Sequence, residues 1–76
     1  MNFYKYIIKN KKVVNTLFHN GVLSFNILIN LEIYQYYLDL RDMGYSKSLS
    51  ITSTSEKKKV SIKTIYNILN QFESEV

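Results

Sequence analysis

The strongest constraint on the fold is the spacing of apolar residues near the end of the chain. Four of them share one face at helical spacing, at i, i+3, i+4 and i+7: Ile65, Ile68, Leu69 and Phe72. Ser61 stands before this run and can be the N-cap, because its hydroxyl can accept a hydrogen bond from an amide in the first turn. The pattern predicts a helix that follows Ser61 and runs to about Ser74, with one buried face.

The opposite face of this predicted helix is polar, and three consecutive lysines precede it. This is a short capped helix whose first two turns are polar and which follows three positive charges. Such a helix is suited to lie against phosphates. The residues left for solvent or a ligand are Lys63, Thr64, Tyr66, Asn67 and Gln71.

Apolar spacing predicts two helices in the first half of the chain. The first runs from Phe3 to about His19, where Asn20-Gly21 offers a left-handed stop, and the polar stretch 9–12 can divide it into two pieces. The second runs from a Ser24 cap to about Met43, ended by Gly44. Its main face carries Ile27, Leu28, Leu31, Tyr34, Leu38 and Arg41, broadened by Ile33, Tyr36, Tyr37 and Leu40. A helix apolar over most of its circumference is expected to be the structural spine or a dimer interface.

Residues 46–58 allow two interpretations. Ser46 can cap a helix to about Lys58, but serine and threonine are poor helix formers and residues 48–51 alternate in polarity. As strands, 47–54 and 60–66 would form a hairpin around the turn 56–59. That turn lacks the Asn-Gly or Asp-Gly of a tight hairpin, and the spacing after Val60 fits a helix better. We favour the helix.

Length and composition limit the remaining possibilities. A chain of 76 residues forms one small domain, and the absence of cysteine excludes a disulfide framework and a thiolate zinc site. A homodimer would add to so small a core, with seven tyrosines and four phenylalanines available to bury. The net charge of +4 suits a polyanionic partner, although the excess of lysine over arginine also reflects the codon usage of an A+T-rich genome.

The charges alternate in blocks along the chain. Residues 1–31 carry lysines and no acid, 32–45 are net acidic, 46–66 are net basic, and the tail is acidic through Glu73 and Glu75. The apolar run 25–40 is too polar to span a membrane, and the N-terminus lacks a signal-peptide core. We therefore expect a protein in the cytoplasm of its host cell.

The sequence gives little support for a catalytic site. Asp39 and Asp42 share a helix face with no further metal ligand, and His19 has no Ser, Cys or Asp at a diagnostic spacing. Two glycines, Gly21 and Gly44, cannot make a glycine-rich phosphate loop. We expect no enzyme, no metal site and no cofactor.

Residues 46–72 resemble a helix-turn-helix, as found in recombinases, transposases and small phage or plasmid regulators. Ser55 takes the small position of the first motif helix, whereas Lys58 stands where an apolar residue is usual and Lys59 where glycine is common. The second half of the motif fits closely at Val60, Ser61, Thr64, Ile65, Ile68 and Leu69.

The resemblance implies double-stranded DNA as the partner, bound by a homodimer. Lys63 and Asn67 correspond to positions that reach base edges, and their chemistry suits guanine and adenine respectively. Backbone contacts are implied at Lys57, Lys58, Lys59, Ser61, Thr64 and Tyr66. Ser61 would cap its helix whatever the function, and the three lysines can equally be a solvated loop.

The expected fold is therefore all-α: an N-terminal helical segment over residues 1–22 and a trihelical helix-turn-helix over 23–76, forming one compact domain. The expected function is sequence-specific DNA binding, as a regulator or DNA-recognition subunit of a phage or mobile element. An interaction or virion-associated protein that docks a partner through the aromatic helix 24–43, without nucleic acid, remains the alternative. With either function we expect Tyr34, Tyr36 and Tyr37 to be core and interface residues and not a base-stacking platform, because they lie in an acidic segment.

Overall fold

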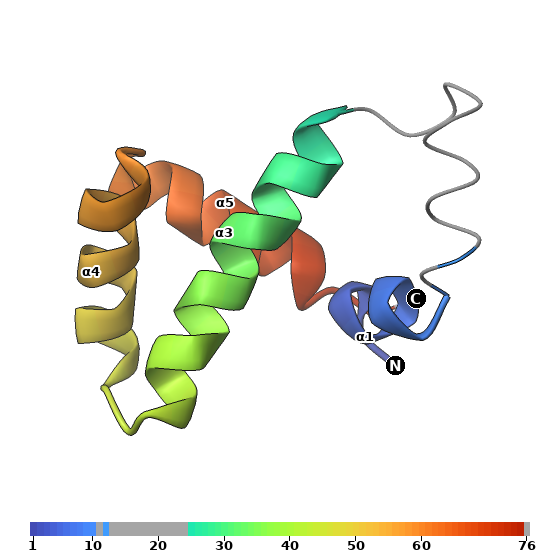
Figure 1. The fold of residues 1–76 in the computed structure, drawn as a ribbon, viewed down its shortest axis with the longest axis horizontal. Helices are drawn as coiled ribbons and strands as arrows, with labels where there is room; N and C mark the ends of the chain where they lie inside the picture. Colours follow the sequence, from blue (N-terminus) through green and yellow to red (C-terminus); the bar gives the residue numbers. More distant parts are fainter. Residues whose placement is uncertain (11, 13–24, 76) are drawn as a thin grey trace.

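The fold is all-helical over the part of the chain that the structure, a computed structural model, describes: residues 1–10, 12 and 25–75. The four helices are α1 (Phe3–Lys9), α3 (Phe25–Asp42), α4 (Lys47–Lys58) and α5 (Ile62–Phe72), shown in Figure 1. The all-α prediction is confirmed. None of these helices is both long and apolar enough to cross a membrane.

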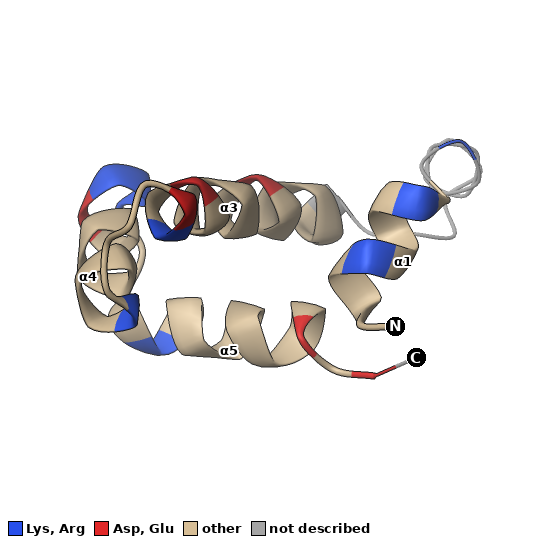
Figure 2. Ribbon diagram, turned by 90° about the horizontal axis from the view of Figure 1, so that it is seen from below, with Lys and Arg blue, Asp and Glu red and all other residues tan. Residues whose placement is uncertain are grey.

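Three helices form the body of the molecule, and α1 packs on one end of it. In Figure 1, α3 and α4 run side by side in opposite directions, and α5 crosses behind α3. The view from below shows α3 and α5 as two layers, with α4 at one end and α1 at the other (Figure 2). The core lies between the layers, and its buried members are Ile7, Ile33, Tyr34, Tyr37, Ile51, Ile65, Ile68, Leu69 and Phe72.

Residues 47–58 are helical, which excludes the hairpin interpretation. The Ser46 hydroxyl accepts a hydrogen bond from the Leu49 amide at 3.2 Å and so caps α4 as predicted. Ser50, Ile51 and Thr54 form the buried face of α4. Their side chains are mostly small, so the helix can pack closely, and this packing outweighs the weak helix propensity of serine and threonine.

The inward face of α3 differs from the predicted one. Tyr34 is buried as expected, but Ile33, Tyr37 and Leu40, which the sequence assigned to the flank, are buried with it. Arg41 was placed on the buried face and is instead exposed, with its guanidinium donating to the Tyr45 carbonyl at 3.0 Å. Because α3 is apolar over most of its circumference, periodicity alone does not identify the face that packs.

An aromatic cluster joins α1, α3 and α5. The ring of Phe72, which is fully buried, stacks on Tyr34 with centroids 5.3 Å apart and on Phe3 at 5.5 Å. Tyr4 of α1 meets Tyr34 edge-on at 4.8 Å. Such aromatic pairs add about 0.5–1.5 kcal/mol each beyond the area they bury.

The first helix is shorter than predicted. Asn2 caps it through the Lys5 amide, and it ends at Lys9, where the Asn10 amide bonds back to the Tyr6 carbonyl. The polar stretch 9–12 therefore ends the helix, as the two-piece alternative allowed. The predicted continuation to His19, the Asn20-Gly21 stop, the Ser24 cap and the domain boundary at 22/23 lie outside the described residues.

The two chain ends lie side by side. The Phe3 amide donates to the Ser74 carbonyl at 2.8 Å, and the N-terminal ammonium of Met1 pairs with Glu75 at 3.1 Å. These contacts fasten α1 to the end of α5. They make the N-terminal helix part of the same compact unit as α3–α5.

Ile65→Ala should lower the free energy of unfolding by about 2–5 kcal/mol, because Ile65 is buried at the centre of the core. Ile62→Ala removes the same atoms from an exposed position of the same helix and should change stability by less than about 0.5 kcal/mol. Chemical denaturation monitored by circular dichroism measures both. An equal decrease in the free energy of unfolding for the two variants would show that the buried side of α5 is assigned wrongly.

Thr54→Val should raise the free energy of unfolding by about 1 kcal/mol. The Thr54 hydroxyl is buried without a hydrogen-bond partner in the part of the chain the structure describes, which is unfavourable. Valine fills the same space with a methyl group. Thr52→Val, at an exposed position two residues earlier in α4, is the control and should leave the midpoint unchanged. A less stable Thr54→Val protein would mean that the hydroxyl is satisfied.

Candidate nucleic-acid interface

The helix α5 divides cleanly into a buried and an exposed side. Ile65, Ile68, Leu69 and Phe72 are all buried, as the spacing predicted. The exposed side carries Lys63, Tyr66, Asn67 and Asn70. The helix ends at Phe72, two residues before the predicted end, where the Glu73 amide bonds to the Leu69 carbonyl.

Two hydroxyl groups lie at the N-terminus of α5, and one of them caps the helix. The Ser61 Oγ accepts from the Thr64 amide at 3.1 Å and lies 2.9 Å from the Thr64 Oγ1. The predicted cap is confirmed, and Thr64 is half-buried beside it. This pair sets the direction of the first turn of α5, at which the backbone amides point along the helix axis into solvent.

The turn between α4 and α5 is fixed by Ser55. Its carbonyl accepts from the amides of Lys59 and Val60, and its hydroxyl donates to the Val60 carbonyl. Val60 packs against the core, and Lys59 adopts a left-handed conformation at φ 57°. This positive φ is a conformation that glycine adopts without strain, and a lysine occupies the position at a cost in strain.

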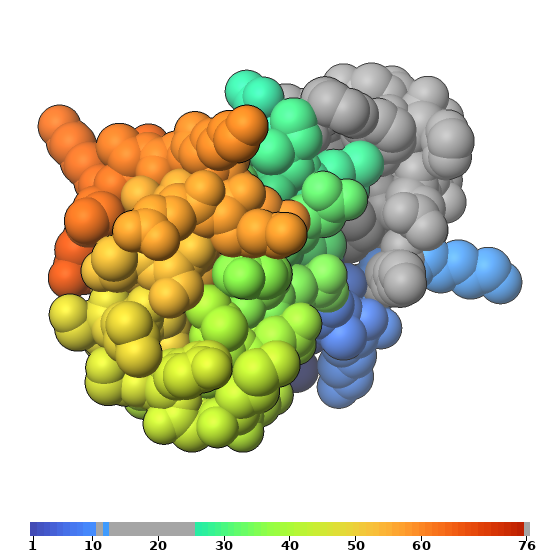
Figure 3. All heavy atoms as spheres, turned by 60° about the vertical axis from the view of Figure 1, so that its left-hand side comes forward, coloured from blue at the N-terminus to red at the C-terminus, as the bar shows by residue number. Residues whose placement is uncertain are grey.

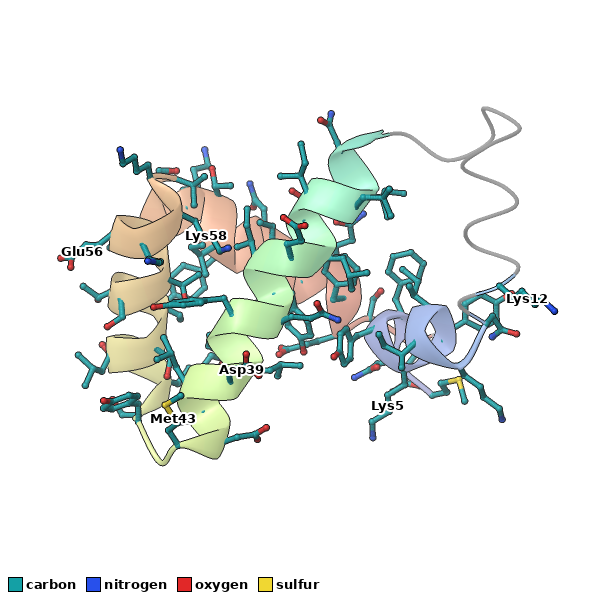
Figure 4. All side chains as sticks on the ribbon, in the orientation of Figure 1. Lys5, Lys12, Asp39, Met43, Glu56 and Lys58 are labelled. Atoms are coloured by element: carbon teal, nitrogen blue, oxygen red, sulfur yellow. The ribbon has the colours of Figure 1, made fainter. Side chains whose placement is uncertain are left out.

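The three consecutive lysines do not form one cluster. Lys57 and Lys59 are exposed, but Lys58 is half-buried, with its ammonium over the Tyr36 ring of α3 at 5.5 Å from the centroid. Figure 4 shows Lys58 between α4 and α3. Lys58 is thus less exposed than a solvated loop or a phosphate contact requires, because a cation–π contact draws it toward α3.

Positive charge gathers at the start of α5 and negative charge past its end. Figure 2 shows lysine at the α4–α5 turn and in the first turn of α5, acidic residues beyond the far end of α5, and acidic residues on α3 mostly on the side away from α5. The two acids beyond α5 are engaged: Glu73 accepts from the Tyr34 hydroxyl at 3.1 Å, and Glu75 pairs with the N-terminus. They do not divide the exposed face of α5.

Burial is the main reason that the pKa of Tyr34 is raised above its ordinary value, and the carboxylate of Glu73 raises it further. The phenol therefore stays protonated and donates to Glu73 over the physiological range. This contact holds the acidic end of α5 against α3. It leaves the exposed polar side of the helix free of that carboxylate.

The two basic segments of the sequence lie far apart in space. Lys5 lies on α1 at one end of the molecule, and Lys58 lies at the other end, as the labels in Figure 4 show. The longest dimension of the chain is 36 Å. Among the described lysines, those around the α4–α5 turn and in the first turn of α5 therefore adjoin the exposed side of α5.

Long side chains from the end of α4 and the start of α5 project into solvent from one side of the molecule (Figure 3). Among the described residues no group of three histidine, aspartate or glutamate side chains is placed to hold a metal ion. The arrangement offers cationic and amide groups to a ligand. Such groups recognise anions and hydrogen-bonding base edges.

The exposed amide of Asn70 was not among the residues that the sequence predicted for the site. Asn70 lies three residues after Asn67 and seven after Lys63, so all three lie on the same side of α5. That spacing was visible in the sequence and could have identified it. Gln71, which the sequence left for solvent, is half-buried and accepts from the Asn30 amide of α3 at 3.5 Å.

A second exposed feature lies at the α3–α4 turn, where Gly44 adopts a positive φ of 96° and lets the chain reverse. Met43, Tyr45 and Leu49 expose about half or more of their surface there, at 71%, 45% and 48%. Figure 4 labels Met43 at this corner, at the opposite end of α4 from the lysines. An apolar corner of this kind suits contact with a protein.

No family model matches the chain, and no curated protein or solved structure matches it at a significant level. The function of this surface therefore has to follow from its own chemistry.

Lys59→Gly should raise the free energy of unfolding by about 0.5–1 kcal/mol. Glycine adopts the left-handed conformation without strain, and this gain exceeds the loss that comes from the greater entropy of glycine in the unfolded chain. Lys57→Gly removes the same charge from the last turn of α4, where glycine lowers stability by about 1 kcal/mol. Thermal denaturation measures the two variants side by side. A destabilised Lys59→Gly protein would contradict the assigned backbone strain.

Proposed function

We propose that the chain binds double-stranded DNA through the exposed side of α5, with α4 and α5 acting as a helix-turn-helix. The observation that carries the proposal is the division of α5, whose inner side is core and whose outer side bears only uncharged polar, apolar and cationic groups. A helix about 10–12 Å across fits the major groove, which is about 12 Å wide.

The proposed contacts follow from position along α5. Lys63 and Asn67 lie in the first two turns, the part of a recognition helix that faces base edges. Lys57 and Lys59 lie beside them at the turn and would neutralise phosphates, while Ser61, Thr64 and Tyr66 flank the helix start. Lys58 is held over Tyr36, so we assign it to the packing of α4 on α3 and not to the phosphates.

We further propose that two copies bind together, as a regulator or DNA-recognition subunit of a phage or mobile element. One helix of 11 residues contacts few base pairs, whereas two copies on half-sites about 34 Å apart contact twice as many. The composition, in which lysine far exceeds arginine and proline is absent, is that of an A+T-rich genome, which suits a phage or mobile element as the source.

A second candidate function is the docking of a partner protein without nucleic acid. It is favoured by the exposed Met43, Tyr45 and Leu49 at the α3–α4 turn. That corner is at the opposite end of α4 from Lys57 and Lys59, so variants there and at α5 separate the two functions.

Affinity for duplex DNA should fall steeply with salt, and Lys57→Ala, Lys59→Ala and Lys63→Ala should each reduce the slope of log affinity against log salt by about one unit. Lys5→Ala and Lys9→Ala on α1 are matched controls of equal charge and should leave the slope unchanged. Fluorescence anisotropy on an A+T-rich duplex measures both sets. Absence of binding at low salt by a folded protein would overturn the proposal and favour protein docking.

A further inference from the structure

The centre of the exposed side of α5 is occupied by Lys63, Asn67 and Asn70. At 100° per residue these three positions lie within about 60° of one another and opposite Ile65 and Leu69. All three are exposed, whereas the two residues opposite them are buried. They therefore form the ridge of α5 that projects furthest from the core.

The amides on this ridge are not used by the fold. Three other asparagines have structural bonds: Asn2 and Asn10 cap α1, and Asn30 joins Gln71, whereas Asn26 on α3 is exposed like the two on this ridge. Asn67 and Asn70 have no hydrogen-bond partner within the part of the chain that the structure describes. Both side chains keep a free donor and a free acceptor side by side.

A free amide matches one base edge in particular. Asparagine can accept from the N6 amino group of adenine and donate to its N7, a pair of bonds that no other base offers in the major groove. Cytosine is read by carboxylates, and α5 contains none from Ile62 to Phe72. Lys63 is the only group on the ridge suited to guanine. The chemistry of the ridge therefore favours A·T base pairs.

The spacing fits neighbouring base pairs. Asn67 and Asn70 are about 4.5 Å apart along the helix axis, close to the rise of about 3.4 Å between base pairs.

We propose that Asn67 and Asn70 read two neighbouring A·T base pairs through bidentate contacts to adenine, with Lys63 at the pair beyond them. This assignment rests on the proposed DNA binding and adds Asn70 as a specificity-determining residue. The target class is then duplex DNA with adjacent A·T pairs in each half-site, recognised from the major groove.

The test begins with duplexes selected from a random pool on the purified full chain, which identifies the preferred site. Anisotropy titrations then compare that site with versions in which each A·T pair is replaced by G·C, or adenine by 7-deazaadenine, which lacks the N7 acceptor. Replacement of a contacted pair by G·C should weaken binding about 5- to 150-fold, the range of a lost bidentate contact, and 7-deazaadenine, which removes one of the two bonds, should weaken it by a smaller factor at the same pair.

The protein variants locate each contact. Asn67→Ala and Asn70→Ala should each abolish discrimination at one pair, a different pair for each, and leave binding to unrelated duplex unchanged. Asn26→Ala, at an exposed asparagine near the start of α3, is the matched control and should change neither. Circular dichroism checks that every variant is folded.

The outcomes separate the two levels of the proposal. Tight binding with no preference for A·T over G·C, or discrimination that survives both asparagine variants, would overturn the assignment and leave DNA binding intact. Absence of binding to any duplex at low salt would overturn DNA binding itself. Loss of discrimination at one pair per variant, with 7-deazaadenine reproducing it, is the result that we expect.

Discussion

The packing of Phe72 is the interaction on which the rest of the structure depends. Its ring, fully buried, lies between Phe3 of α1 and Tyr34 of α3, so one side chain holds three helices together. The Tyr34 hydroxyl then reaches Glu73, the next residue along the chain. Because the last turn of α5 is held in this way and its first turn is held by the Ser55–Val60 contacts, both ends of the helix are fixed. The outer side of α5 needs no contact of its own to keep its position.

That arrangement explains how a domain with so small a core can leave a whole helix side free for a ligand. The buried residues of α5 alternate with polar ones at the helical period, so its four inward side chains complete the core. Two features of the fold are unfavourable: Lys59 adopts the left-handed conformation at the α4–α5 turn, and the Ser50 and Thr54 hydroxyls of α4 are buried with no hydrogen-bond partner among the described residues. Each of these costs is of the order of 1 kcal/mol, against about 2–5 kcal/mol for the truncation of one core residue to alanine.

Features that depend on interactions within one helix were predictable from the sequence, whereas features that depend on contacts between helices were not. The caps at Ser46 and Ser61 and the inner side of α5 were predictable because hydroxyl capping and 3.6-residue spacing act within one helix. The packed face of α3 was not, since apolar residues surround that helix and the aromatic contacts with α1 and α5 select the face. Lys58 was assigned to the surface because only the folded chain brings Tyr36 beneath it. In the proposed site the positions of Lys63 and Asn67 followed from spacing, whereas the freedom of Asn70 and the bond that occupies Gln71 required the structure.

The placement of the charges also bears on how many copies would bind. The net charge of +4 overstates the positive surface beside α5, because the lysines of α1 lie at the far end of the molecule. Three lysines remain at the proposed interface: Lys57, Lys59 and Lys63. Three phosphate contacts correspond to a salt slope of about −2.7, so that affinity would fall only about 40-fold between 50 and 200 mM salt. If the chain binds DNA as proposed, a single copy would bind weakly and non-specifically through these charges, and most of its discrimination between sequences would come from the amides of Asn67 and Asn70. Two copies on one site double the phosphate contacts and the slope, which is why the proposed DNA binding and the proposed homodimer belong together.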